Sequence, residues 1–168
     1  PLIDVSSSLA PLVLDTVGYD ERGLLGLALS PSFASDGTLF FYASYLKGDA
    51  TPDFTVSPDT LIMDGTGYDD IDHHSVIIKR IITDDNSDGI FDFSDSYVDT
   101  EILRFEQPTS DTFASYGIGS NHNGGHLFFD RDGLLMVAIG DGGDTNDTGN
   151  GHVAIGNGAD ATNILGTL

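Results

Sequence analysis

Cysteine and tryptophan are absent from this chain of 168 residues, and basic residues are scarce. Without cysteine the chain forms neither disulfides nor thiolate metal sites. Only six Lys and Arg residues stand against 27 Asp and Glu residues, which gives a formal net charge of −21. We therefore expect no nucleic-acid partner, because phosphates need basic contacts. An anionic membrane surface is disfavoured for the same reason.

Long apolar runs are also missing. No stretch approaches the roughly 18 consecutive apolar residues of a membrane-spanning helix, so no membrane insertion is expected. A hydrophobic content of 39% and a mean hydropathy of −0.03 suit a globular domain with a sizeable core. Glutamate is rare as well, so the acidity comes from aspartate, which favours turns and calcium loops over helices. A high-salt habitat would give the same bias.

The apolar residues that are present come in short runs rich in Val, Ile, Phe and Tyr, separated by Gly, Asp, Ser and Pro. Helical patterns are almost absent, so the sequence predicts an all-β fold. The predicted strands are residues 12–17, 24–29, 38–45, 75–83, 100–105, 125–129 and 134–139.

Acidic and Gly-rich loops are predicted between the strands, at residues 48–74, 106–120 and 141–163. The first of these contains His73 and His74 close to three aspartates. A transition-metal site is one interpretation, but an exposed polar loop is the favoured one. A packed core position is predicted for His126, and a flexible, solvated loop for residues 141–147.

Two stretches of the chain repeat one another. Residues 26–42 and 125–137 each contain an apolar run, an Asp-Gly turn and a second apolar run, which predicts two similar β-hairpins. Repeated small sheets are typical of β-propeller blades. We expect a first blade at about 24–105 and an incomplete second blade from about 121. Residues 12–17 would be the outer strand of a preceding blade.

Residues 84–95 follow a calcium-loop pattern, Asp-x-Asn-x-Asp-Gly, with glycine at the sharp turn in position six. An aspartate replaces the usual glutamate at position twelve. The pattern predicts a Ca²⁺ loop that orders an insert in a hairpin, and an ordinary acidic turn is the alternative. The predicted ligands are Asp84, Asn86, Asp88, the carbonyl of Ile90, Asp92 and Asp95.

His122 lies in a turn rich in Gly and Asn, directly before a predicted hairpin. Residues 121–129 read Asn-His-Asn-Gly-Gly-His-Leu-Phe-Phe, and Gly-Asp-Gly-Gly follows at 140–143. A neutral imidazole at the mouth of a β-fold is well suited to take up a proton near neutral pH. The spacing alone, however, favours a histidine that merely caps a loop.

These motifs resemble the active-site segment of the soluble PQQ-dependent sugar dehydrogenases, the glucose/sorbosone dehydrogenase family. Residues 21–28, which read Glu-Arg-Gly-Leu-Leu-Gly-Leu-Ala, are similar to the first-blade signature of that family, as are Pro31, Phe33, Gly37 and Leu39 after them. Two motifs in the right order make the resemblance specific. It does not cover the insert between them.

The resemblance implies a role for three residues. His122 would remove a hydroxyl proton from the hemiacetal carbon of a sugar while hydride passes to PQQ. Asp141 would orient the ring of His122 and stabilise its charge. Glu21 matches a polar position near the sugar pocket. The alternatives are a strand-ending aspartate in a Gly-rich turn and a simple polar residue before the first strand.

The resemblance also implies a six-bladed propeller and a secreted or periplasmic location, with PQQ and Ca²⁺ as cofactors. Six blades of about 45 residues need about 270 residues, so the chain is expected to be an N-terminal fragment. PQQ carries three carboxylates that need Lys or Arg partners, and those are expected on later blades. The alternative is a non-catalytic, calcium-stabilised secreted propeller that binds a protein or a glycan.

Overall fold

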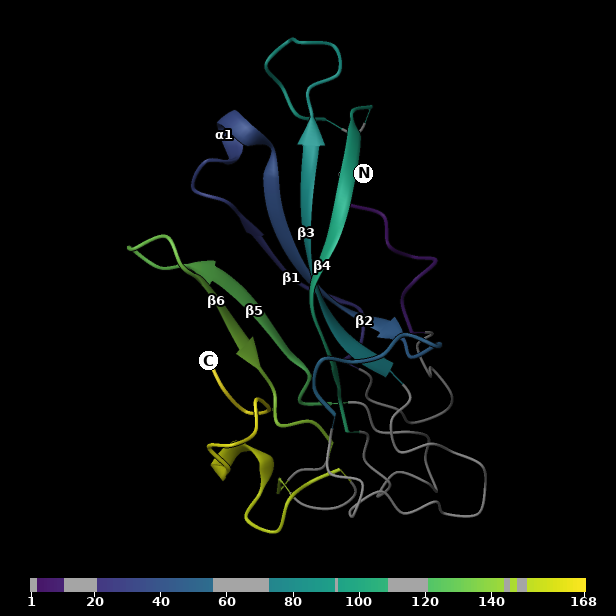
Figure 1. The fold of residues 1–168 in the computed structure, drawn as a ribbon, viewed down its shortest axis with the longest axis vertical. Coiled ribbons are helices and arrows are strands. Elements are labelled where there is room, and N and C mark those ends of the chain that lie inside the picture. Colours follow the sequence, from purple (N-terminus) through teal and green to yellow (C-terminus); the bar gives the residue numbers. More distant parts are fainter. Residues whose placement is uncertain are drawn as a thin grey trace.

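The computed structural model describes residues 3–10, 21–55, 73–92, 94–108, 121–143, 146–147 and 151–168. These residues form two antiparallel sheets with almost no helix, which confirms the predicted all-β class (Figure 1). Six of the seven predicted strands are present, and residues 12–17 lie outside the described residues. No helix in these ranges is long and apolar enough to span a membrane.

The larger sheet is a meander whose four strands pair in chain order. Its strands are β1 (Leu24–Leu29), β2 (Thr38–Leu46), β3 (His73–Thr83) and β4 (Ser96–Glu106). The smaller sheet is a hairpin of β5 (Gly124–Phe129) and β6 (Leu135–Ile139). On the edge of β6 that faces away from β5, the amide of Ile139 donates a hydrogen bond to the carbonyl of Thr167 at 2.8 Å.

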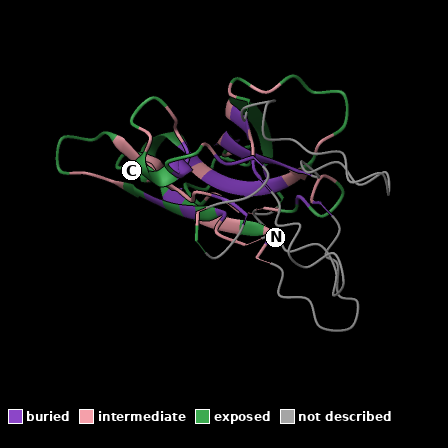
Figure 2. Ribbon diagram, turned by 90° about the horizontal axis from the view of Figure 1, so that it is seen from below, coloured by how far each residue is buried: buried purple, intermediate pink, exposed green. Residues whose placement is uncertain are grey.

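Alternating side chains give the larger sheet two buried faces. In β2, Phe41 and Ala43 point to one face and Tyr42 to the other, as the two-residue period of a strand requires. The first face is covered by the N-terminal segment around Val5, and the second packs against Leu127 of the hairpin. Burial is accordingly concentrated in the middle of the sheet (Figure 2). The core between the two sheets thus fixes the hairpin against β2.

Glycines let the two sheets meet where β1 and β5 pack together (Figure 1). A Cβ on Gly26 would lie 1.8 Å from the carbonyl oxygen of Gly125, so no side chain fits there. On the other strand, a Cβ on Gly125 would lie 2.5 Å from the Cβ of Leu25. This contact brings the residues just before β1 close to the turn just before β5.

The connection between β1 and β2 differs from the predicted hairpin turn. It contains a one-turn helix, α1 (Phe33–Asp36), which ends at Gly37 in the left-handed conformation with φ +63°. The carboxylate of Asp36 accepts the amide of Thr38 at 2.9 Å. The Asp-Gly pair therefore ends a helix and starts a strand. In the second half of the repeat, an Asp-Gly pair does lie in the hairpin turn, where the amide of Gly133 donates to the carbonyl of Asp130.

Two histidines predicted in the acidic loop 48–74 lie in the sheet instead, so that prediction was wrong. Strand β3 begins at His73, and His73 and His74 pair with Leu46 and Tyr45 of β2. This pairing leaves the two histidines 0% and 1% exposed. Residues 56–72, with the three aspartates of the predicted loop, lie outside the described residues. His126, predicted in the core, is exposed and lies against the ring of Phe128.

Candidate active site around His122

His122 lies on a turn with an unusual backbone. Its φ is +57°, in the left-handed region that residues other than glycine rarely adopt. Gly124 and Gly125 follow with φ values of +76° and +113°. A Cβ on Gly140 would lie 1.6 Å from the His122 carbonyl oxygen, so the end of the hairpin passes directly against the turn. The glycines of the motif therefore serve the geometry of the turn.

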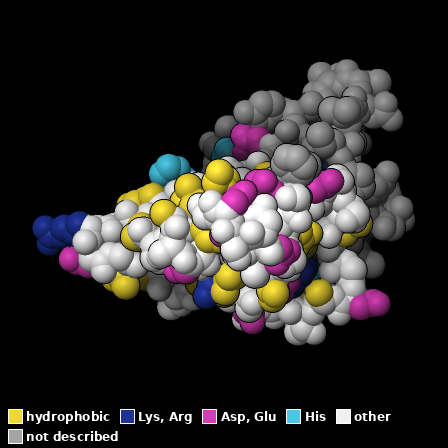
Figure 3. All heavy atoms as spheres, turned by 90° about the horizontal axis from the view of Figure 1, so that it is seen from above, with side chains coloured by type: hydrophobic (Ala, Val, Ile, Leu, Met, Phe, Trp, Pro, Cys, Tyr) yellow, Lys and Arg dark blue, Asp and Glu magenta, His cyan; other side chains and the backbone are white. Residues whose placement is uncertain are grey.

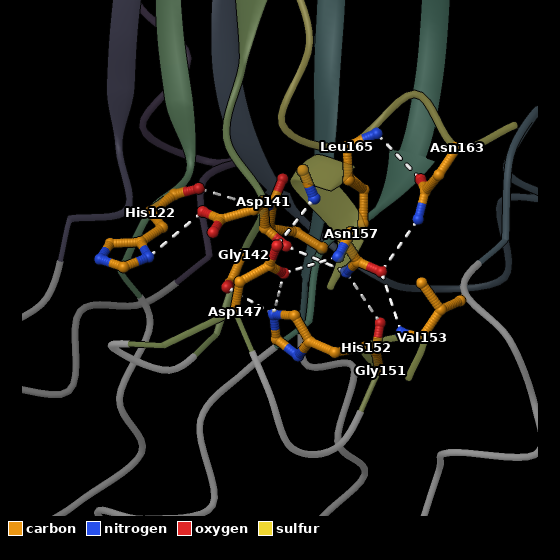
Figure 4. A network of polar contacts seen from close by, with 12 residues as sticks. His122, Asp141, Gly142, Asp147, Gly151, His152, Val153, Asn157, Asn163 and Leu165 are labelled. Carbon is orange, nitrogen blue, oxygen red and sulfur yellow. Dashed lines mark hydrogen bonds and ion pairs between the residues drawn. The ribbon is translucent and has the colours of Figure 1, made fainter. Parts of the chain in front are cut away.

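One nitrogen of the His122 ring points toward Asp141 (Figure 4). Nδ1 lies 3.2 Å from Oδ1 of Asp141, and the two side chains are 36% and 27% exposed. The angle does not satisfy a hydrogen bond, since Nδ1 is a buried atom without one. The exposed part of the side chain therefore lies away from Nδ1. The sequence prediction that placed His122 beside Asp141 matches this geometry.

Hydrogen bonds hold the main chain of His122 from both sides. Its amide donates to Oε2 of Glu21 at 2.6 Å, and its carbonyl accepts the amide of Gly142 at 3.1 Å. Nε2 of Gln107 donates to the same carbonyl at 3.4 Å. Glu21 is therefore brought to the predicted site, with one carboxylate oxygen on the backbone of the histidine.

A buried polar layer supports the next residue of the turn, Asn123. The hydroxyl of Tyr42 donates to the Asn123 carbonyl at 2.7 Å, and Nε2 of His73 lies 2.8 Å from Oδ1 of Asn123. Burial raises the pKa of the Tyr42 hydroxyl well above its usual range, so it stays a neutral donor. Strands β2 and β3 thus fix the turn from the larger sheet. No local sequence pattern indicates this layer, because its members are far apart in the chain.

Asn157 ties the segment after β6 to the main chain of Asp141 (Figure 4). Its Nδ2 donates to the carbonyls of Asp141 at 3.1 Å and Gly151 at 3.0 Å. Its Oδ1 accepts the amide of Val153 and the side chain of Asn163. Asn157 is 1% exposed, so these bonds are shielded from water.

Asp147 and His152 complete this scaffold. The carboxylate of Asp147 accepts the amides of Asn157 at 2.6 Å and Gly158 at 2.9 Å. The buried His152 has Nε2 2.8 Å from the carbonyl of Gly142, so this nitrogen donates. In the predicted solvated loop at 141–147, Gly142 and Gly143 are buried and Asn146 is exposed, so the prediction is wrong for the two glycines. The main chain of Asp141, just after β6, is held by a hydrogen bond from Asn157, sixteen positions away. No local sequence pattern indicates this contact.

No protein-family model matches this chain. A proposal about function therefore rests on the geometry of the site and on the motif resemblance.

One polar atom next to His122 has no protein partner. Oδ1 of Asn121 is buried and accepts no hydrogen bond within the part of the chain that the structure describes. Buried polar atoms in proteins are generally paired, with protein, water or ligand.

The predicted calcium loop lies at the opposite end of the sheet, between β3 and β4 (Figure 1). Its aspartates cap the loop: Asp84 accepts the amides of Asp88 at 3.1 Å and Gly89 at 2.8 Å, and Asp88 accepts the amide of Ile90 at 2.8 Å. Asp95 accepts the amides of Asp85 and Asp92. Within the described ranges, no three His, Asp or Glu side chains converge on a metal position. The ligand set also includes the Asn86 amide and the Ile90 carbonyl, so calcium binding stays a prediction.

The arginines with described contacts do not build an anion site. Arg80 pairs with Asp99 at 2.7 Å, and Arg104 pairs with Glu101 at 2.7 Å. Arg22 is buried, and Arg131 is exposed beside Asp132 in the β5–β6 turn. On the face seen from above, basic side chains are few among more numerous acidic ones (Figure 3). These arginines therefore do not supply the clamp that three carboxylates of PQQ need.

Proposed function

We propose that this chain belongs to a sugar dehydrogenase in which His122 is the general base and Asp141 supports it. The observation that carries the proposal is the pair itself: Nδ1 of His122 lies 3.2 Å from the Asp141 carboxylate, while the side chain as a whole is 36% exposed. An imidazole with one nitrogen beside a carboxylate and part of its ring accessible is the arrangement of a base that acts on a bound hydroxyl.

The carboxylate determines which nitrogen acts. Beside Asp141, Nδ1 favours the protonated tautomer, which leaves Nε2 of His122 as the acceptor. Oxidation of a hemiacetal carbon removes one hydroxyl proton and one hydride. His122 would take the proton through Nε2, and Asp141 would stabilise the imidazolium that forms.

The hydride acceptor is not supplied by the described residues. The motif resemblance assigns that role to PQQ, but the arginines described here are paired, buried or far out on the hairpin turn. The residues present therefore do not fit PQQ by themselves. The proposal for this chain is limited to sugar binding and the proton step.

The proposed architecture is a β-propeller with a secreted or periplasmic location, and Ca²⁺ is proposed to order the loop at 84–95. Two features support the propeller. The four strands of the larger sheet form one meander, and β1 and β5, the first strands of the two sheets, pack against each other. Adjacent blades of a propeller place their sheets in this way, each sheet covering one face of the next.

The test is sugar oxidation by the full-length protein, assayed with PQQ, Ca²⁺ and an artificial electron acceptor. We expect His122→Ala to lower kcat about 10²- to 10⁴-fold, the usual cost of losing a general base. Asp141→Asn should lower kcat less, because it removes only the supporting charge. The control is Asp132→Asn, which removes an exposed charge from the β5–β6 turn.

If His122→Ala keeps near-wild-type turnover, the base assignment is wrong. If the wild type oxidises no aldose but binds a glycan or a protein in a calcium-dependent way, the non-catalytic binding protein is the better interpretation.

A further inference from the structure

We propose that Glu21 is a positioning residue, which fixes the main chain of His122 and through it the ring, and that sugar binding is not its role. The motif resemblance places Glu21 near the sugar pocket, but the structure shows a different contact. The proposal rests on the proposed role of His122 as a base. Its test also has a readout that does not depend on activity.

The contact is short and joins distant parts of the chain. Oε2 of Glu21 accepts the backbone amide of His122 at 2.6 Å, across 101 positions of sequence. Glu21 is partly buried, which limits competition from water. The close approach of Gly26 to Gly125 brings the two segments together.

The hydrogen bond to Glu21 matters because the backbone of His122 is in an unfavourable conformation. A non-glycine residue at φ +57° persists only where its surroundings hold it. The carbonyl side is held by Gly142 and Gln107, and Glu21 holds the amide side. With both peptide groups fixed, the direction of the Cα–Cβ bond of His122 is fixed too, which restricts where the ring can lie. Without Glu21, the peptide before His122 can rotate, and the ring can leave Asp141.

The same contact competes with sugar binding. The amide of His122 takes one of the two lone pairs of Oε2 at 2.6 Å, so two sugar hydroxyls bound in a bidentate way would have to share that oxygen with it. A positioning role also needs an acceptor oxygen at this point but not a full charge. Glutamine has that oxygen and the same length. The glutamine variant therefore separates positioning from stabilisation of charge.

The experiment compares Glu21→Gln, Glu21→Ala and the control Asp132→Asn in the full-length protein. Two quantities are measured: the hydrogen–deuterium exchange rate of the His122 amide, and kcat and KM for the oxidised sugar. If Glu21→Ala does not fold, Glu21→Asp takes its place, because its carboxylate is one methylene too short to reach the amide.

We expect Glu21→Ala to speed exchange of the His122 amide about tenfold or more and to lower kcat about 10- to 100-fold, since small displacements of a catalytic group have effects of this size. KM should stay within about twofold, because sugar contacts are kept. Glu21→Gln should retain most of the protection and most of kcat. Asp132→Asn should change neither quantity.

Three results would overturn the proposal: unchanged exchange in Glu21→Ala, a raised KM with kcat retained, or a Glu21→Gln variant as impaired as Glu21→Ala. If the wild type oxidises no sugar, the proposed function fails, while the exchange rates still decide whether Glu21 holds the turn.

Discussion

Two carboxylates near His122 act on different parts of the same residue. Asp141 faces the ring at 3.2 Å, and Glu21 accepts the backbone amide at 2.6 Å. The first contact bears on the proton step and the second on the geometry of the turn. Neither interaction is visible as a local pattern, yet both residues stand in motifs that the sequence analysis selected. Residue types at a site are thus easier to predict than the contacts they make.

His74 is the residue whose burial should be most visible in the pH dependence of stability. Its ring is buried, Nδ1 accepts from Arg104 at 3.3 Å, and Nε2 has no hydrogen bond among the described residues. Burial, with the positive charges of Arg104 and Lys47, lowers the pKa of His74 from 6.5 to about 4. Glu101 acts in the opposite direction but does not prevent the fall.

We predict that the free energy of unfolding decreases as the pH falls from about 6.5 to about 4. In this window the unfolded chain binds a proton at His74 that the folded chain does not, so acid favours unfolding, by up to about 3 kcal/mol near pH 4. Urea unfolding at pH 7.5, 5.5 and 4.5 measures the effect. The variant His74→Gln should remove most of it.

The aspartates whose pKa is lowered by hydrogen bonds, such as Asp36 and Asp92, do not interfere, because they lose their contribution only below 3.8. An unchanged pH dependence in His74→Gln would show that His74 titrates normally.

Among the elements, β1 and β5 depend on close packing between backbones. We predict that Gly26→Ala destabilises the protein by about 1–3 kcal/mol, because its methyl group would meet the carbonyl oxygen of Gly125, which cannot move aside as a side chain can. The control is Gly133→Asn in the β5–β6 turn, where φ is +82° and nothing lies within 4 Å. Asparagine tolerates that conformation, so the control should be nearly neutral. Thermal unfolding of both variants measures the effect. Equal melting temperatures of Gly26→Ala and Gly133→Asn would contradict the close packing of Gly26 against Gly125.

The loop between β3 and β4 is predicted to bind Ca²⁺. Its aspartates already cap the loop, which pre-orders the oxygens that calcium would use. Saturating Ca²⁺, at about 100 times the dissociation constant, should stabilise the fold by about 2.7 kcal/mol. The melting temperature should rise with Ca²⁺, and Asp84→Ala with Asp88→Ala should abolish the rise. A rise that persists in this double variant would place the ion elsewhere.

Strands and turns could be predicted where the residues of the segment itself determine its conformation. A short apolar run that contains Phe41 and Tyr42 predicts β2, and Asp-Gly at 132–133 predicts the β5–β6 turn. The same pair at 36–37 ends the helix α1, because neighbouring residues add a helical turn before it. The start of β3 was missed, since His73 and His74 look polar in sequence and are buried only by pairing with β2. The scaffold of Asn157 depends on contacts between distant segments, which no single-sequence pattern contains.

For the whole molecule, charge is the dominant property. With 27 acidic and six basic residues, the surface repels anions, and three of the four arginines are buried. We predict that purified residues 1–168 do not bind PQQ tightly, with or without Ca²⁺. An absorbance titration of PQQ measures this, with salt added to screen the repulsion. A dissociation constant below about 1 μM, the affinity of a specific site, would show that a clamp exists within this chain.

The central claim is that a sugar hydroxyl meets the open nitrogen of His122. A crystal structure of the full-length protein with a bound aldose tests it most directly. We expect the anomeric hydroxyl oxygen to lie within about 3.2 Å of Nε2 of His122, with Nδ1 still beside the carboxylate of Asp141. A sugar bound at another position, with Nε2 facing only water, would contradict the account.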